Sequence, residues 1–246
     1  MIGLGTIANV ALILVGGAIG LVFRKVLAKR LTDTILQGVG LAVVLIGLSG
    51  ALKAAFTIID GQIDTQYTLL MIVSLAVGGL IGGWIDIERR LERFAAVCAR
   101  RFSASDSGLF AQGFVTATLL FCVGAMAIVG SLEDGMHHHA DILYAKSLLD
   151  GISAMIFAST MGIGVLFAAL SVGLYQGAIT LLSTVVAPYL QEEVVAQMSY
   201  VGSVLILALG LNMLGIAKIK AGNLLPAVFL PLIYYIIKSL WVTAGG

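Results

Sequence analysis

Long apolar runs, separated by short polar stretches, dominate the chain. Each run is close to the length of about 20 residues that an α-helix needs to cross a bilayer. Six of these runs occupy about residues 2–23, 34–56, 67–85, 109–129, 198–217 and 224–242. The pattern predicts an all-α, polytopic helical membrane protein with about seven or eight transmembrane helices, in a single membrane domain that covers residues 1–246.

One apolar stretch, 143–190, is about twice as long as a single span requires. We interpret it as two spans, at about 144–167 and 170–188, joined by a tight turn. One span followed by a re-entrant segment is the alternative.

The composition excludes a water-soluble domain. Hydrophobic residues make up 60% of the chain and charged residues 11%, whereas an average soluble domain carries about 25% charged residues. The 30 glycines favour closely packed membrane helices, because small residues let two backbones approach each other. The net charge of +1 gives no indication of nucleic-acid binding.

The segment 87–102 is too highly charged to cross the membrane. Its apolar residues recur at helical spacing, and its polar face carries the arginines Arg89, Arg90, Arg93, Arg100 and Arg101. We expect an amphipathic helix that lies on the anionic cytoplasmic leaflet. A solvated extension of the preceding helix is the alternative.

The loop charges predict the orientation of the chain. With eight spans, most lysines and arginines fall on one side, in the loops around 24–30, 89–101 and 218–220. The acidic loops fall on the other side. Basic loops stay in the cytoplasm, so both termini should face outward. A seven-span chain would instead place Lys218 and Lys220 outside.

A glycine motif occurs twice and indicates an internal repeat. The pattern GGxxG appears in 15–20 and again in 77–82, and a Gln-Gly pair follows each copy, at 37–38 and 112–113. Duplicated helix pairs are common in transporters. The predicted units are repeat one at 1–60, repeat two at 66–133 with the amphipathic helix 87–102 inserted in it, and C-terminal helices at 143–246.

Charged and amide side chains inside the predicted spans are the candidate functional residues. Lys146 and Asp150 stand one helical turn apart, and ionisable residues at membrane depth are by default functional. In the functional interpretation Asp150 carries a proton or cation, amides coordinate the substrate, and glycines break a helix beside a cavity. In the alternative, the same groups only hold helices together by hydrogen bonds. The candidate path residues are Lys146, Asp150, Ser153, Thr160, Gly162, Gly164, Tyr175, Gln176 and Asn212.

No sequence motif for an enzyme, a cofactor or a metal site is present. The histidine cluster at 137–139 follows Glu133 and Asp134 in a short polar loop. Imidazole and carboxylate groups bind divalent metals, but consecutive loop residues point in different directions, so we favour a solvated loop. We therefore expect no metal, no cofactor and no enzymatic activity.

Several short stretches resemble a bacterial family. They are the GGxxG motif together with Gly3–Asn9, Lys146–Gly151, Gly162–Val165 and Tyr175–Gly177. Across nearly the whole chain the sequence resembles the YqgA/YdfK type of uncharacterised bacterial inner-membrane proteins. The resemblance implies a multi-pass protein of the inner membrane and implies no substrate.

These observations favour a small secondary transporter or channel for an ion or a small polar solute. The alternative is a membrane scaffold or assembly protein that binds lipid or a partner through its arginine helix. The expected partners are the lipid bilayer and a small ion or solute. A homo-oligomer is compatible with the sequence.

Overall fold

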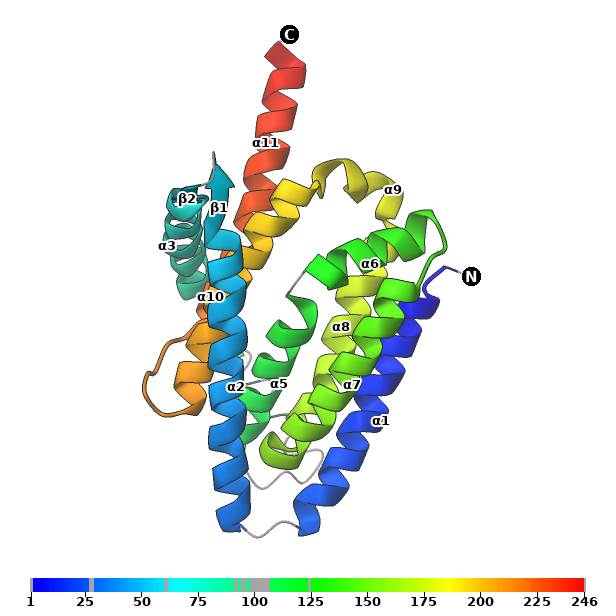
Figure 1. The fold of residues 1–246 in the computed structure, drawn as a ribbon, viewed down its shortest axis with the longest axis vertical. Helices are drawn as coiled ribbons and strands as arrows, with labels where there is room; N and C mark the ends of the chain where they lie inside the picture. The colour runs from blue at the N-terminus through cyan, green and yellow to red at the C-terminus, as the bar shows by residue number, and fades with distance from the viewer. Residues whose placement is uncertain are drawn as a thin grey trace.

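The apolar runs fold into helices that run back and forth along the long axis of the molecule (Figure 1). The computed structural model describes residues 2–26, 29–59, 62–90, 93, 97, 107–123 and 125–245. Its longer helices are α1 (Leu4–Val26), α2 (Lys29–Ala55), α3 (Thr68–Ile85), α5 (Ser107–Cys122), α6 (Ala125–Met136), α7 (Asp141–Met161), α8 (Gly164–Leu181), α10 (Glu192–Met213) and α11 (Leu230–Gly245). The shorter elements are β1 (Phe56–Ile59), β2 (Gln62–Thr65), α9 (Ser183–Val186), η1 (Ala187–Tyr189) and η2 (Ala221–Phe229).

Seven helices within the described residues are long and apolar enough to cross a membrane. The pair α5 and α6 raises this number to eight if it is counted as one span. The predicted all-α polytopic fold is therefore confirmed. The apolar run 109–129, however, is not one straight helix, because α5 and α6 meet at 58°. The bend carries α6 to the end of α8, where the Gly135 backbone lies against the Thr180 carbonyl.

The long apolar stretch 143–190 forms two helices, α7 and α8, as the two-span interpretation predicts. The turn lies at Gly162 and Ile163, several residues before the predicted boundary. Gly162 has a φ of +80°, a conformation that glycine adopts without steric cost. An uninterrupted apolar sequence offers few other signals for the position of a turn.

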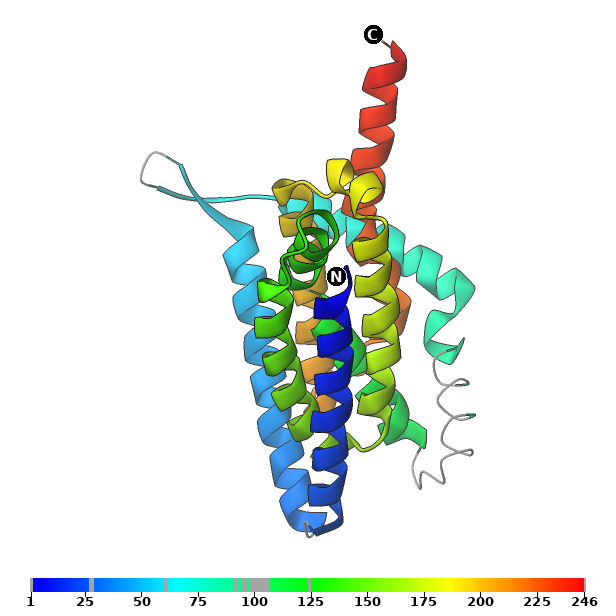
Figure 2. The ribbon, with the colours of Figure 1, turned by 90° about the vertical axis from the view of Figure 1, so that its right-hand side faces the viewer.

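Two parts of the chain differ from the pattern of uniform helices and connecting polar stretches. The polar stretch between the runs 34–56 and 67–85 contains regular structure, because β1 and β2 pair as an antiparallel hairpin in which Phe56 faces Thr65. Its β-branched residues suit a strand. The last apolar run does not form a uniform helix either: 3₁₀ helix η2 contains Pro226, and α11 follows it. Proline lacks the N–H that an α-helix interior requires. Figure 2 shows the hairpin and α11 extending beyond the helix bundle.

Both GGxxG motifs lie at close helix contacts. In α1, Gly16 lies against the Gly151 carbonyl of α7, and Gly20 lies against the Met155 carbonyl. In α3, Gly82 lies against the Asn223 carbonyl of η2. A Cβ at any of these glycines would overlap a backbone oxygen. The repeated motif thus marks two places where backbones touch.

The two chain termini lie toward the same end of the bundle in Figure 1, which we call the terminal end. The end of α1, the start of α2 and the turn between α7 and α8 lie at the opposite end, which we call the basic end. There the Arg24 side chain packs against Gly162. This arrangement agrees with an even number of crossings.

Only part of the predicted amphipathic helix 87–102 belongs to the described residues. Residues 87–90 are helical, and the side chains of Arg89, Arg90 and Arg93 are exposed. Arg100 and Arg101 lie outside the described residues, so the predicted orientation of this helix at the membrane surface stays a prediction.

Candidate polar site in the helix bundle

Four polar side chains from three helices meet inside the bundle, and we call them the polar cluster. Asn9 comes from α1, Lys146 and Asp150 come from α7, and Gln176 comes from α8. Asn9 and Gln176 are 0% exposed, Lys146 is 6% exposed and Asp150 is 7% exposed. The cluster is therefore closed off in this conformation.

Hydrogen bonds connect the whole cluster. The Lys146 ammonium donates to Asp150 Oδ2, one turn further along α7. Asn9 Nδ2 donates to the same carboxylate oxygen at 2.9 Å and to Gln176 Oε1 at 3.2 Å. One amide of α1 therefore bridges α7 and α8.

The two charges of the cluster compensate each other. A single charge at the bilayer centre costs about 2.5–3.5 kcal/mol on insertion scales. Because the pair is formally neutral and the carboxylate accepts from two donors, part of this cost is offset. Removing one member leaves a buried charge without its counter-ion.

Several buried polar atoms near this cluster have no hydrogen-bond partner among the described residues. Asn9 Oδ1 and Gln176 Nε2 belong to the cluster itself, and Thr6 Oγ1 and Thr180 Oγ1 lie about one turn further toward the terminal end. Buried polar groups are normally paired, and each exception needs an explanation. A polar ion or solute that supplies the missing bonds is one such explanation.

Asp134 continues the polar groups to the terminal end. Its Oδ2 accepts the Gly5 N–H at 3.1 Å, and the residue is 0% exposed. The carboxylate thus satisfies a free donor at the start of α1 and faces the positive end of the helix dipole. Asp134 Oδ1 is also buried without a partner among the described residues. Polar atoms therefore continue from Asp150 past Asn9 and Thr6 to Asp134.

The bundle is apolar on the other side of Asp150. Ala154, Phe157, Ala158 and Met161 of α7 belong to a buried hydrophobic core. The Thr160 hydroxyl donates to the Phe157 carbonyl of its own helix at 3.0 Å, and Ser153 is half-buried. In this part of the described bundle, the buried polar atoms without partners therefore lie at the Lys146–Asp150 pair or between it and the terminal end.

The structure brings together Lys146, Asp150 and Gln176 of the predicted residues and places the others elsewhere. Gly162 lies at the α7–α8 turn, and Gly164 lies against the Phe110 carbonyl where α8 meets α5. Tyr175 packs against the core around α10. Asn212 lies at the end of α10, where it donates to the Ile219 carbonyl at 2.7 Å.

Three polar residues around the cluster are absent from the predicted path: Thr6, Asn9 and Asp134. Thr6 and Asn9 are three residues apart and so share a face of α1, which is a usable signal. Nothing in the sequence placed that face beside α7. The histidine loop lies at the terminal end, where His137 Nδ1 is 3.0 Å from Glu133 Oε2 in an exposed pair.

This molecule is a polytopic helical membrane protein in which apolar helices surround a buried charge pair. The chain belongs to the family described as "Protein of unknown function (DUF554)", which matches residues 4–236. It is similar to "Uncharacterized membrane protein YdfK" of Bacillus subtilis (strain 168), with 37% identity over 92% of this chain and 93% of the relative. It is also similar to "Uncharacterized protein YqgA" of Escherichia coli (strain K12), with 29% identity over 92% of this chain and 94% of the relative. The resemblance inferred from the sequence is confirmed. No solved structure matches this chain.

Proposed function

We propose that this protein is a small secondary transporter or channel for an ion or a small polar solute in the bacterial inner membrane. The observation that carries the proposal is the polar cluster: a buried Lys146–Asp150 pair beside two amides that keep a free acceptor and a free donor. A cluster serving only to hold helices together would use these atoms in interhelical bonds. No enzymatic reaction forms part of the proposal.

The cluster suggests how a cation is handled. Lys146 acts as a tethered cation that occupies Asp150 when no other cation is bound. A cation that reaches Asp150 must compete with this ammonium, which then moves away from the carboxylate. Asn9 Oδ1 offers the incoming cation a further oxygen ligand. Cation entry and displacement of the Lys146 ammonium are coupled at one carboxylate in this mechanism.

The position of the polar atoms supports entry from the terminal end. Among the described residues, the buried polar atoms without partners that belong to α1, α6 and α8 lie at the polar cluster or between it and the terminal end: they are on Thr6, Asn9, Asp134, Gln176 and Thr180. On the other side the core around Phe157 and Met161 is apolar. Release toward the basic end therefore requires α1, α7 and α8 to separate there, as alternating access demands.

Flux measurements in proteoliposomes test the proposal. The purified chain is assayed for proton flux and for uptake of sodium, potassium, ammonium and small neutral polar solutes. We expect flux for the native chain and loss of flux for Asp150→Asn and for Lys146→Met combined with Asp150→Leu. Asp64→Asn, which changes an exposed carboxylate of β2 in the same way, should keep full flux. Full flux in the double variant, or no flux of any probe in the native chain, contradicts the proposal.

One observation favours the scaffold alternative. Arg89, Arg90 and Arg93 are exposed beyond the end of α3, where a partner protein, a second copy of the chain or anionic lipid can bind. Neutralising these three arginines to glutamine should abolish capture of that partner in a scaffold and should leave flux unchanged in a transporter. The two measurements together separate the two functions.

A further inference from the structure

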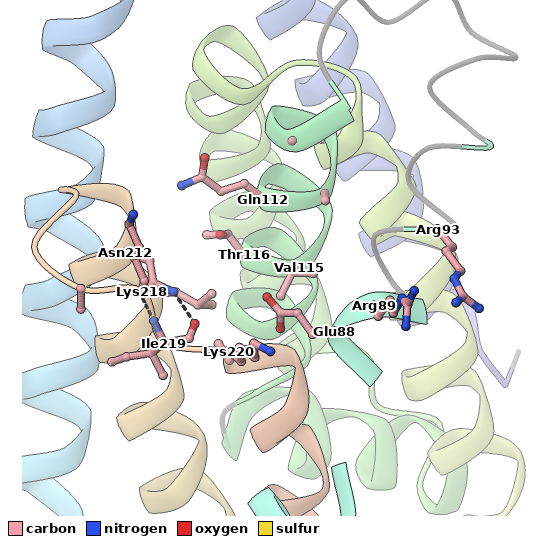
Figure 3. Close-up of a pocket in the computed structure, with 15 residues that line it drawn as sticks. Glu88, Arg89, Arg93, Gln112, Val115, Thr116, Asn212, Lys218, Ile219 and Lys220 are labelled. Carbon is pink, nitrogen blue, oxygen red and sulfur yellow. Dashed lines mark hydrogen bonds between the residues drawn. The ribbon is translucent and has the colours of Figure 1, made fainter. Parts of the chain in front are cut away.

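A second polar site lies apart from the polar cluster, in a cavity of about 850 Å³. The cavity is bounded by α5, the end of α10, the loop 214–220 and the turn that follows α3. Figure 3 shows the side chains that line it. None of them belongs to the Lys146–Asp150 site, so the proposed transport path does not explain the cavity.

Two pairs of reciprocal hydrogen bonds hold the walls of this cavity in place. Asn212 donates to the Ile219 carbonyl at 2.7 Å and accepts the Ile219 N–H at 2.8 Å. Glu88 Oε2 accepts the Gly222 N–H at 2.7 Å, and the Glu88 N–H donates to Asn223 Oδ1 at 2.8 Å. These bonds position the loop and the turn that carry the basic residues.

The cavity lining is strongly basic. Lys218 and Lys220 come from the loop, and Arg89 and Arg93 come from helical residues that follow α3. In Figure 3 the two arginines stand at the edge opposite Asn212 and Lys218. Among the described residues that line the cavity, Glu88 is the only carboxylate, and its Oε2 already accepts the Gly222 N–H. Four cations against one carboxylate favour an anionic ligand.

Two neutral polar groups on α5 complete the site. Gln112 and Thr116 lie one helical turn apart and point toward Asn212 and Lys218 in Figure 3. Thr116 is 1% exposed, and its hydroxyl has no hydrogen-bond partner among the described residues. A buried hydroxyl that lines a basic cavity and lacks a partner points to a ligand that accepts its hydrogen bond.

We infer that this cavity binds a phosphate group. Lysine ammonium groups bind phosphate as point charges, and the Gln112 amide and the Thr116 hydroxyl can donate to its remaining oxygens. The group belongs either to an anionic lipid headgroup or to a soluble phosphate, since both present the same oxygens. The site does not depend on the proposed transport function.

Binding of two probes to the full chain tests the inference. In phosphate-free buffer and non-ionic detergent, binding of radiolabelled inorganic phosphate is measured by equilibrium dialysis, and binding of phosphatidylglycerol is measured by native mass spectrometry. The test variant is Lys218→Gln with Lys220→Gln. The matched control is Lys53→Gln with Lys238→Gln, which removes two exposed lysines far from the cavity.

We expect saturable binding of at least one probe by the native chain. The Lys218/Lys220 variant should bind that probe at least about tenfold more weakly, because hydrogen bonds to charged groups are lost, and the control should bind normally. Saturable phosphate binding identifies a soluble ligand, and binding of phosphatidylglycerol alone identifies a lipid. An equal loss in the control variant, or no saturable binding of either probe, overturns the inference.

A smaller change keeps the test valid if the double variant fails to fold. Thr116→Val removes the buried hydroxyl with little change in shape, and Thr116→Ser keeps it. Weaker binding in the valine variant with recovery in the serine variant supports a direct bond to the ligand. Equal binding by all three proteins excludes Thr116 from the site and contradicts the geometry on which the inference rests.

Discussion

The Lys146–Asp150 pair makes an unusual prediction: the double variant should be more stable than either single variant. Asp150→Leu leaves a buried ammonium without its counter-ion, and Lys146→Met likewise leaves a buried carboxylate without its counter-ion. Both side chains are less than one-tenth exposed, so water does not compensate for the missing partner. Removing both charges together avoids this penalty.

The magnitude follows from these contacts. Removing one partner of a buried pair costs about 3–5 kcal/mol. In the double variant Asn9 Nδ2 loses the Asp150 oxygen but keeps Gln176 Oε1, and such a loss costs about 1 kcal/mol. The double variant should therefore exceed either single variant in stability by about 2 kcal/mol or more.

Unfolding in detergent, followed by far-ultraviolet circular dichroism, measures these differences. The tryptophans Trp84 and Trp241 are exposed on α3 and α11, so their fluorescence reports poorly on the core. Glu133→Gln is the control, because it breaks an exposed pair with His137 at the same helical spacing and should cost at most about 1 kcal/mol. If the costs of the two single substitutions simply add in the double variant, the argument from burial is wrong.

Three further predictions follow. Gly82→Ala should destabilise the protein by about 1–3 kcal/mol, because its Cβ overlaps the Asn223 carbonyl. Gly83→Ala, which has open space around the added methyl group, should be neutral or slightly stabilising. Thermal unfolding of both variants in detergent measures the difference. Asp134→Ala should lower stability by about 1 kcal/mol, since the Gly5 N–H loses its acceptor; an unchanged melting temperature would exclude this capping role. Fusion reporters should place 24–34, 86–108 and 218–223 in the cytoplasm and both termini outside; a cytoplasmic C-terminus would refute the eight-span topology.

The helical membrane fold could be predicted because it depends on local properties of the chain. Runs of about 20 apolar residues can satisfy their backbone groups only as helices in a membrane. The bend between α5 and α6 could not be predicted in this way, because it depends on where α8 and α1 lie. The hairpin at 56–65 was missed because its β-branched residues directly extend an apolar helical run.

The candidate site could be predicted only in part. The spacing of Lys146 and Asp150 places both on one helix face, and this is visible in the sequence. The partner Asn9 lies on another helix, and no local pattern shows which helices meet. Asn212 differs in another way. Its position inside an apolar run suggested a residue of the transport path, whereas in the structure its side chain forms two hydrogen bonds to the Ile219 backbone and holds the loop that follows α10.

The glycine motif of α1 and the polar cluster depend on each other. An asparagine side chain is short, so Asn9 can reach Asp150 and Gln176 together only if α1 lies very close to α7 and α8. Gly16 and Gly20 permit this approach, because their backbones touch the carbonyls of α7 two and three turns further along α1. The motif in α3 makes an equally close contact with η2, but α3 carries Met71 at the position that corresponds to Asn9. The same close packing at glycine therefore occurs beside a polar cluster only in α1, where Asn9 supplies a side chain that bridges the two neighbouring helices.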